Sequence, residues 1–256
     1  MANAHTPPPQ DASLAAAFEA ACGALSPGGI GTLQERTLHS TLKFWLQPDA
    51  TQHEVPVGHH VADIFDGVGV TEVQTGSLYP LQKKLDALLA THPVTVVMPL
   101  PHYQWVFWID PETGVAGPPH RSPRSGRVAE ALPELFWLRD RWARYPDRLT
   151  VRVLVLDMEE YRLQDGWGNG GKRGSHRADR RPLAVADDIT LTAPAEAVSL
   201  LSSLPSPFTT RDFQKVLGHR GRAMTRALRF LEHTGVIVRC GKQGNAIVYS
   251  LAKNYP

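Results

Sequence analysis

Residues 61–77, VADIFDGVGVTEVQTGS, predict two short strands joined by a tight turn at the Asp-Gly step that begins at Asp66. If the chain folds back at this turn, the strands form an antiparallel hairpin. The expected pairs are Phe65–Val70, Ile64–Thr71 and Asp63–Glu72. The last pair sets two carboxylates side by side, and like charges directly opposite one another destabilise a sheet. The acidic pair is therefore the first candidate for a functional site.

The composition limits the choice of protein class. The chain has 256 residues, 42% of them hydrophobic and 20% charged, enough for one large domain or a domain with a small module. Its net charge is only +2, so the overall charge identifies no partner and local clusters must do so. Cys22 and Cys240 lie far apart and fit a reduced, cytoplasmic setting. No apolar run could span a bilayer and no signal peptide is recognisable, so we expect no membrane partner.

The first 190 residues have the patterning of one α/β domain. Residues 1–28 are expected to form a flexible or partly helical N-terminal segment, and residues 29–190 to form the domain itself. Helical and strand patterns alternate inside it. The expected elements are a helix at 32–46, a strand at 53–58, the hairpin at 60–75, a helix at 78–92 and strands at 94–100, 103–110 and 149–163.

The order helix, strand, strand, strand, helix, strand, with Asp63 followed by Glu72-Val73-Gln74, resembles the PD-(D/E)XK nuclease superfamily. The resemblance covers residues 30 to about 100. The run of motifs also resembles an uncharacterised bacterial family, which extends the likeness toward residue 182. The resemblance implies a restriction-endonuclease-like αβββαβ core.

The same resemblance assigns roles to individual residues. Asp63 and Glu72 would be metal ligands, with the main-chain carbonyl of Val73 as a third. Glu35, on the first helix, would support the site. Gln74 stands where the superfamily has a lysine, so it would orient a water molecule without supplying a positive charge.

The chemistry of the residues agrees with these implied roles. Two carboxylates on neighbouring strands offer hard oxygen ligands, and Mg²⁺ takes one or two carboxylates together with waters and phosphate oxygens. A bound Mg²⁺ or Mn²⁺ would relieve the repulsion between Asp63 and Glu72 and polarise a phosphate. His39 shows no zinc-ligand spacing and is expected to pack or to contact phosphate. Solvated charges on an exposed sheet face, or charges paired with arginines, remain the alternative for the acidic pair.

Two stretches rich in Gly, Pro and Arg, residues 111–127 and 165–182, are expected to be loops. Arginines and loop amides suit phosphate oxygens, so loops lying over the carboxylates would clamp a nucleic-acid backbone. The stretch KRGSHR in the second loop also resembles a motif of the uncharacterised bacterial family. The candidate contacts are Arg121, Arg124, Arg127, Lys172, Arg173, Ser175, His176 and Arg177. Solvated, mobile loops remain the alternative.

Residues 194–256 resemble a winged-helix domain, with three helical patterns followed by two strands. On the last helix Arg222, Arg226 and Arg229 recur at i, i+4 and i+7, a spacing typical of a basic recognition helix. Lys242 lies at the tip of the expected wing. A winged helix used for protein contact or dimerisation is the alternative.

The sequence therefore predicts an endonuclease dependent on Mg²⁺ or Mn²⁺, which hydrolyses phosphodiester bonds of DNA and carries a DNA-binding tail. A non-catalytic DNA-binding or regulatory protein on a decayed nuclease core is the alternative, and Gln74 favours it. A protein–protein module is a third hypothesis, in which the steep salt dependence of phosphate contacts would be absent. The sequence leaves a homodimer open.

Overall fold

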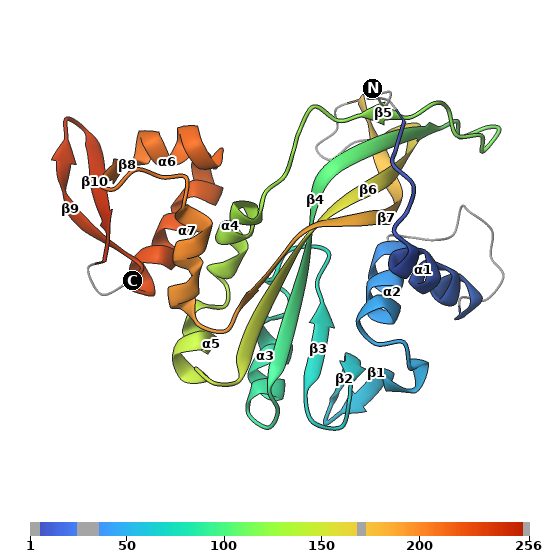
Figure 1. Ribbon diagram of the computed structural model, residues 1–256, viewed down its shortest axis with the longest axis horizontal. Helices are drawn as coiled ribbons and strands as arrows, with labels where there is room; N and C mark the ends of the chain where they lie inside the picture. Colours follow the sequence, from blue (N-terminus) through green and yellow to red (C-terminus); the bar gives the residue numbers. More distant parts are fainter. Residues whose placement is uncertain (1–5, 25–35, 168–172, 253–256) are drawn as a thin grey trace.

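The computed structural model describes residues 6–24, 36–167 and 173–252 and has a mixed α/β architecture (Figure 1). Its large sheet has seven strands: β1 (His53–Val57), β2 (His60–Phe65), β3 (Val70–Val73), β4 (Val94–Ile109), β5 (His120–Arg121), β6 (Leu149–Trp167) and β7 (Arg173–Leu191). Its helices are α1 (Ala12–Ala24), α2 (Arg36–Leu46), η1 (Ala50–Gln52), α3 (Gln82–Leu89), η2 (Val128–Ala131), α4 (Leu132–Leu135) and α5 (Arg139–Arg144). The C-terminal part contains η3 (Pro194–Leu201), β8 (Phe208–Thr209), α6 (Thr210–Leu217), α7 (Gly221–His233), β9 (Ile237–Gln243) and β10 (Ala246–Leu251).

The strand order of the large sheet is β1-β2-β3-β4-β6-β7, and β5 pairs with the outer half of β4. Strands β3, β4 and β6 are parallel, whereas β1, β2 and β7 join their neighbours antiparallel. Residues 36–109 thus contain the expected order of helix, three strands, helix and strand. β1 lies at the sheet edge, the position that its Pro56 favours, because proline donates no ladder hydrogen bond.

Alternate residues of β4 face two different helical layers, which explains the continuous apolar run at residues 94–100. Val96 packs in the hydrophobic cluster that contains Leu85 of α3. Its neighbour Val97 packs in the cluster that contains Leu38 and Leu42 of α2. In Figure 1, α1 and α2 lie on one side of the sheet and the C-terminal part lies on the other. A parallel strand covered on both faces is apolar at nearly every position, and Thr95 is the exception in this stretch.

The stretches at 94–100 and 103–110 form the single strand β4, so the expectation of two strands was wrong. The pairing of β4 with β6 shifts register between Pro101 and Gln104, where the ladder is irregular and a proline is tolerated. The sequence pattern divides at this point, but the long partner strand holds both halves in one ladder.

The expectation of a loop at 165–182 was also wrong. β6 continues to Trp167 and β7 begins at Arg173, so the basic stretch after residue 172 is a strand. Its arginines pair across the ladder with acidic residues: Arg181 lies opposite Glu159, and Arg180 lies opposite Glu160. Opposite charges on neighbouring strands stabilise a sheet, and this pairing outweighs a composition that is typical of loops.

The C-terminal part has its own three-stranded sheet, in the order β8-β10-β9, beside α6 and α7. A capping box starts α6, because the Thr209 hydroxyl accepts from the Asp212 amide and the Asp212 carboxylate accepts from the Thr209 amide. Phe230 of α7 lies with its ring centroid 6.1 Å from that of Trp142 on α5. Both belong to one hydrophobic cluster, so the two parts of the chain share a core.

Two further expectations concern membrane-spanning helices and the two cysteines. None of the helices in the described ranges has the length and apolar character that crossing a membrane requires. Cys22 and Cys240 are both exposed, free thiols.

Gly126 lies on the chain that leads from β5 to α4, at the point where this chain packs directly against the backbone of β4. A Cβ atom at position 126 would lie 1.8 Å from the Pro101 carbonyl oxygen, so Gly126→Ala forces two backbone segments apart. We expect the free energy of unfolding, measured by urea denaturation, to fall by about 1–3 kcal/mol. Gly117→Ala, on the connection from β4 to β5, is the control, since its Cβ would meet only the Trp108 oxygen at 3.6 Å. Equal stability of both variants would contradict the close approach.

Candidate active site

The hairpin has the expected register at its turn. Phe65 pairs with Val70 and Ile64 with Thr71, as predicted. The Asp66 carboxylate accepts from the amides of Val68 and Gly69 at 2.9 and 2.8 Å, and Gly67 has the positive φ of 90° that favours glycine.

One position further from the turn, side chains bond to the opposing backbone. Asp63 Oδ2 accepts a hydrogen bond of 2.8 Å from the Val73 amide on β3. Glu72 Oε1 in turn accepts from the Asp63 amide on β2, at 3.4 Å. Each carboxylate thus bonds to the strand that carries the other, so the two acidic residues are adjacent, but the ladder of β2 with β3 ends at Ile64–Thr71 and does not extend to the expected Asp63–Glu72 pair.

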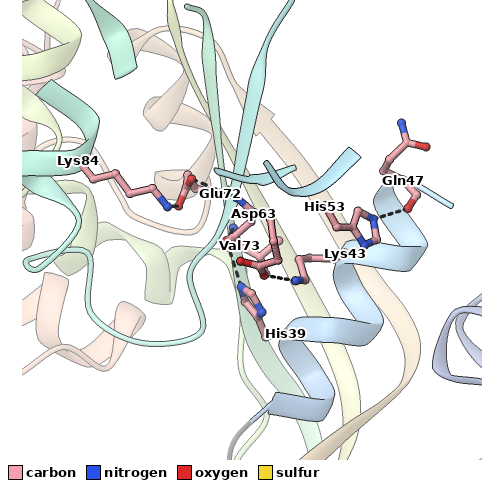
Figure 2. Close-up of polar contacts among 9 residues, drawn as sticks. His39, Lys43, Gln47, His53, Asp63, Glu72, Val73 and Lys84 are labelled. Carbon is pink, nitrogen blue, oxygen red and sulfur yellow. Dashed lines mark hydrogen bonds and ion pairs between the residues drawn. The ribbon is translucent and has the colours of Figure 1, made fainter. Parts of the chain in front are cut away.

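A histidine and a lysine reach this pair from two different helices (Figure 2). His39 Nε2, on α2, lies 3.0 Å from Asp63 Oδ2. Lys84 Nζ, on α3, donates to Glu72 Oε2 at 2.5 Å. Because α2 and α3 cover opposite faces of the sheet, the two carboxylates are held from two sides. The sequence analysis did not identify Lys84. The feature that could have identified it is its place beside Leu85, which α3 buries against the sheet.

The two carboxyl groups have unequal acidities. Glu72 is only 3% exposed, and this burial, together with the charge of Asp63, raises its pKa to about 7 even though Lys84 acts in the opposite direction. Burial also acts to raise the pKa of Asp63, but the hydrogen bond and charge of His39 and the Val73 amide hold it below its ordinary value. Near neutral pH the site therefore contains one carboxylate that is ionised and one that titrates.

The donor set determines which metals the pair suits. Two carboxylates and a main-chain carbonyl at Val73 are all oxygen donors, which fits Mg²⁺ or Mn²⁺ better than zinc. Among the described ranges there is no group of three or more His, Cys, Asp or Glu side chains placed to hold a metal. A site with two carboxylates meets the smaller requirement of Mg²⁺, which keeps several waters. Glu35, the third acidic residue expected here, lies outside the described residues.

Gln74 and the turn that follows it end the strand that carries Glu72. The Gln74 amide nitrogen of the side chain donates to the Ser77 oxygen at 3.0 Å, and its backbone amide donates to Val97 at 2.8 Å. Glu134 of α4, which sequence reasoning missed, accepts from the Ser77 hydroxyl and the Leu78 amide, both at 2.8 Å. These bonds fix the chain directly after Glu72-Val73-Gln74.

The three arginines of the first basic stretch have different surroundings. The guanidinium carbon of Arg121 lies 4.1 Å from the ring centroid of Tyr103. Arg124 is exposed, 3.9 Å from a Glu130 oxygen. Arg127 donates to the Val216 oxygen of α6 at 2.8 Å, so it helps to hold the C-terminal part.

The second basic stretch is a strand, and its described side chains face acidic or polar partners. His176 Nδ1 contacts Asp165, and Arg177 Nε lies 3.4 Å from Glu160 Oε2. Ser175 accepts a long bond of 3.5 Å from Arg162. Lys172 and the side chain of Arg173 lie outside the described part of the chain.

The basic stripe on α7 is divided by its packing. Arg222 and Arg229 are exposed. Arg226 is partly buried, with Nη1 3.8 Å from Glu134 and its guanidinium carbon 5.7 Å from the Trp137 ring centroid. Lys242 is exposed on β9 beside the β9–β10 turn.

Comparison with known proteins places the large sheet in a described family. Residues 36–192, from the start of α2 to the end of β7, match the family model described as Domain of unknown function (DUF8091). An uncharacterized protein of Treponema pallidum (strain Nichols) is 28% identical over 222 residues, which is 86% of this chain and 86% of that protein. No solved structure matches.

The raised pKa of Glu72 predicts how stability depends on pH. The folded state favours the neutral carboxyl, so this contribution is complete below the ordinary pKa of 4.5 and is lost as the pH rises through about 7. Glu72→Gln keeps a neutral group at all pH values. In metal-free buffer, we expect the variant to gain stability over the wild type between pH 5 and 8, by at most about 3 kcal/mol. Denaturant melts across this range measure the difference, and a constant difference would contradict the shift.

Proposed function

The chain belongs to the family described as Domain of unknown function (DUF8091), and we propose that it is a metal-dependent nuclease whose Asp63–Glu72 pair holds a divalent cation. The main support is the reciprocal bonding of the two carboxylates, each to the backbone of the other residue's strand, which keeps them adjacent. The nearby charge of Asp63 and burial together raise the pKa of Glu72. Such a pair is costly without a nearby cation, and perturbed carboxyl groups gather at functional sites.

The topology supports a restriction-endonuclease-like core. The order helix, three strands, helix and strand along the chain is that of the PD-(D/E)XK superfamily. Strands β1 to β4 also lie next to one another in the sheet in their chain order. The C-terminal order of helix, strand, two helices and two strands likewise supports a winged-helix unit. The finer fold assignment therefore belongs to the same proposal as the function.

Each residue of the site has its own proposed role. Asp63, Glu72 and the Val73 carbonyl would hold Mg²⁺ or Mn²⁺, which when bound polarises a phosphate and lowers the pKa of a water molecule. Lys84 supplies a positive charge that Gln74 cannot, and its ammonium group already lies 2.5 Å from Glu72. With Glu72 engaged by the cation, this ammonium group is free to donate to a phosphate oxygen. Gln74 keeps its side-chain oxygen as an acceptor for a water molecule.

Nucleic acid, DNA in particular, is the proposed substrate because exposed basic side chains lie on both parts of the chain. They are Arg121, Arg124, Arg222, Arg229 and Lys242. The partners found for Arg127, Arg177 and Arg226 are internal, so we propose that these three arginines mainly stabilise the fold.

A non-catalytic nucleic-acid-binding protein is the second candidate function, and one observation favours it. Lys84 neutralises Glu72 from within the chain, so it could take the place of a metal ion in a decayed site. Under this hypothesis the protein binds DNA but leaves it intact with either metal.

A cleavage assay tests the first candidate. Purified protein is incubated with single-stranded, duplex and branched DNA and with RNA, in Mg²⁺ or Mn²⁺. We expect cleavage of at least one DNA form, and we expect Asp63→Asn to lower its rate by more than about 100-fold, since loss of a metal ligand should exceed the 10–100-fold typical of outer-shell changes.

The matched control is Asp66→Asn, which changes a carboxylate of the same hairpin that bonds only to its own turn. It should cleave at the wild-type rate. Cleavage that is equal in the two variants would place the activity elsewhere, and intact substrates under all conditions would favour the second candidate.

A further inference from the structure

A groove lies between the α4–α5 segment and α7, away from the acidic pair. Figure 1 shows α7 beside α4 and α5. The groove has a volume of about 430 Å³ and is lined by Phe136, Arg139, Arg229, Glu232 and His233. This volume falls in the lower part of the range of small-ligand sites, about 300–1,000 Å³.

One wall of the groove is a guanidinium fixed over an aromatic ring. The guanidinium carbon of Arg139 lies 3.9 Å from the ring centroid of Phe136. Its Nη1 donates to the Phe136 carbonyl at 2.6 Å and its Nη2 lies 3.2 Å from Asp140 Oδ2, so three contacts hold the group. A planar, weakly hydrated guanidinium stacks on aromatic rings, and one that is already ordered loses little entropy when a second ring is added.

The opposite wall carries an uncompensated positive charge. Arg229 is exposed, and among the described residues no hydrogen bond or ion pair engages it. Glu232, the acidic residue of this wall, is neutralised by Arg239, whose Nε and Nη2 lie 2.5 and 3.0 Å from its two oxygens. His233 lies 3.6 Å from Asp140. The groove therefore offers a stacking surface on one side and a free cation on the other.

We propose that this groove binds an unpaired nucleotide of a nucleic-acid strand, with its base stacked on the Phe136–Arg139 pair and its phosphate at Arg229. Stacking on a π-face tolerates any base, which suits an unpaired strand more than a read sequence. Arg222 lies exposed two turns before Arg229 on the same helix, so a neighbouring duplex would lie along α7. The inference rests on the proposed nuclease function and names its substrate class: duplex nucleic acid with an unpaired extension.

Binding without cleavage tests the groove separately from the active site. Fluorescence anisotropy in a chelating buffer compares a labelled blunt duplex with the same duplex carrying a short single-stranded overhang. We expect the wild type to prefer the overhang by about 10-fold, within the range for stacking of one base. Arg139→Lys, which keeps the charge but loses the stacking plane, should remove this preference, and so should Arg229→Ala.

The matched control is Arg144→Lys, which changes an exposed arginine at the end of the same helix α5. It should keep the preference. A preference that Arg139→Lys leaves unchanged would overturn the groove proposal, as would a free mononucleotide that competes as strongly as the overhang.

The outcomes separate this inference from the proposed function. Overhang preference that depends on Arg139 supports the groove even if no substrate is cleaved. Absence of binding to either oligonucleotide would overturn the groove and the nucleic-acid function together. Cleavage of DNA with no overhang preference would overturn the groove alone.

Discussion

The structure depends on a reciprocal exchange between two adjacent strands, in which Asp63 bonds to the Val73 amide and Glu72 bonds to the Asp63 amide. Nearer the turn, at Ile64–Thr71 and Phe65–Val70, the strands are joined by main-chain hydrogen bonds. At Asp63 and Glu72 the side-chain carboxylates make the bonds between the strands. The exchange keeps two carboxylates adjacent in a largely buried place, where their repulsion and desolvation are costly. Everything proposed about catalysis follows from the need of this pair for a positive charge.

The rest of the fold supplies charge and rigidity around this exchange. Helix α2 brings His39 to Asp63 from one side of the sheet, and α3 brings Lys84 to Glu72 from the other. Glu134 then fixes the chain that leaves β3 and lies 3.8 Å from Arg226 of α7, so the C-terminal part is joined to the same segment. A nucleic acid that contacts α7 would therefore meet a surface held at a fixed place relative to the acidic pair.

Local patterns predicted the hairpin, the order of the first helix and strands, and the adjacency of Asp63 and Glu72, because turn chemistry and alternation are properties of short segments. Long-range pairing decided the rest. The basic stretch at 173–182 is a strand because β6 offers Glu159 and Glu160 across the ladder, which composition does not reveal. Lys84 could not be assigned to Glu72 from the sequence, since the contact depends on how α3 packs on the sheet. The internal role of Arg226 likewise depends on the shared core between α4 and α7.

The most direct test of the central claim is a crystal structure of the protein soaked in Mn²⁺ at pH 8, where Glu72 is ionised. The anomalous scattering of manganese locates the ion independently of any assay. The account predicts a manganese peak bonded to Asp63 and Glu72, with the Lys84 ammonium group moved off the oxygen it now contacts. Density that shows Lys84 still bound to Glu72 and no manganese at the pair, in crystals that take up the ion elsewhere, would contradict it.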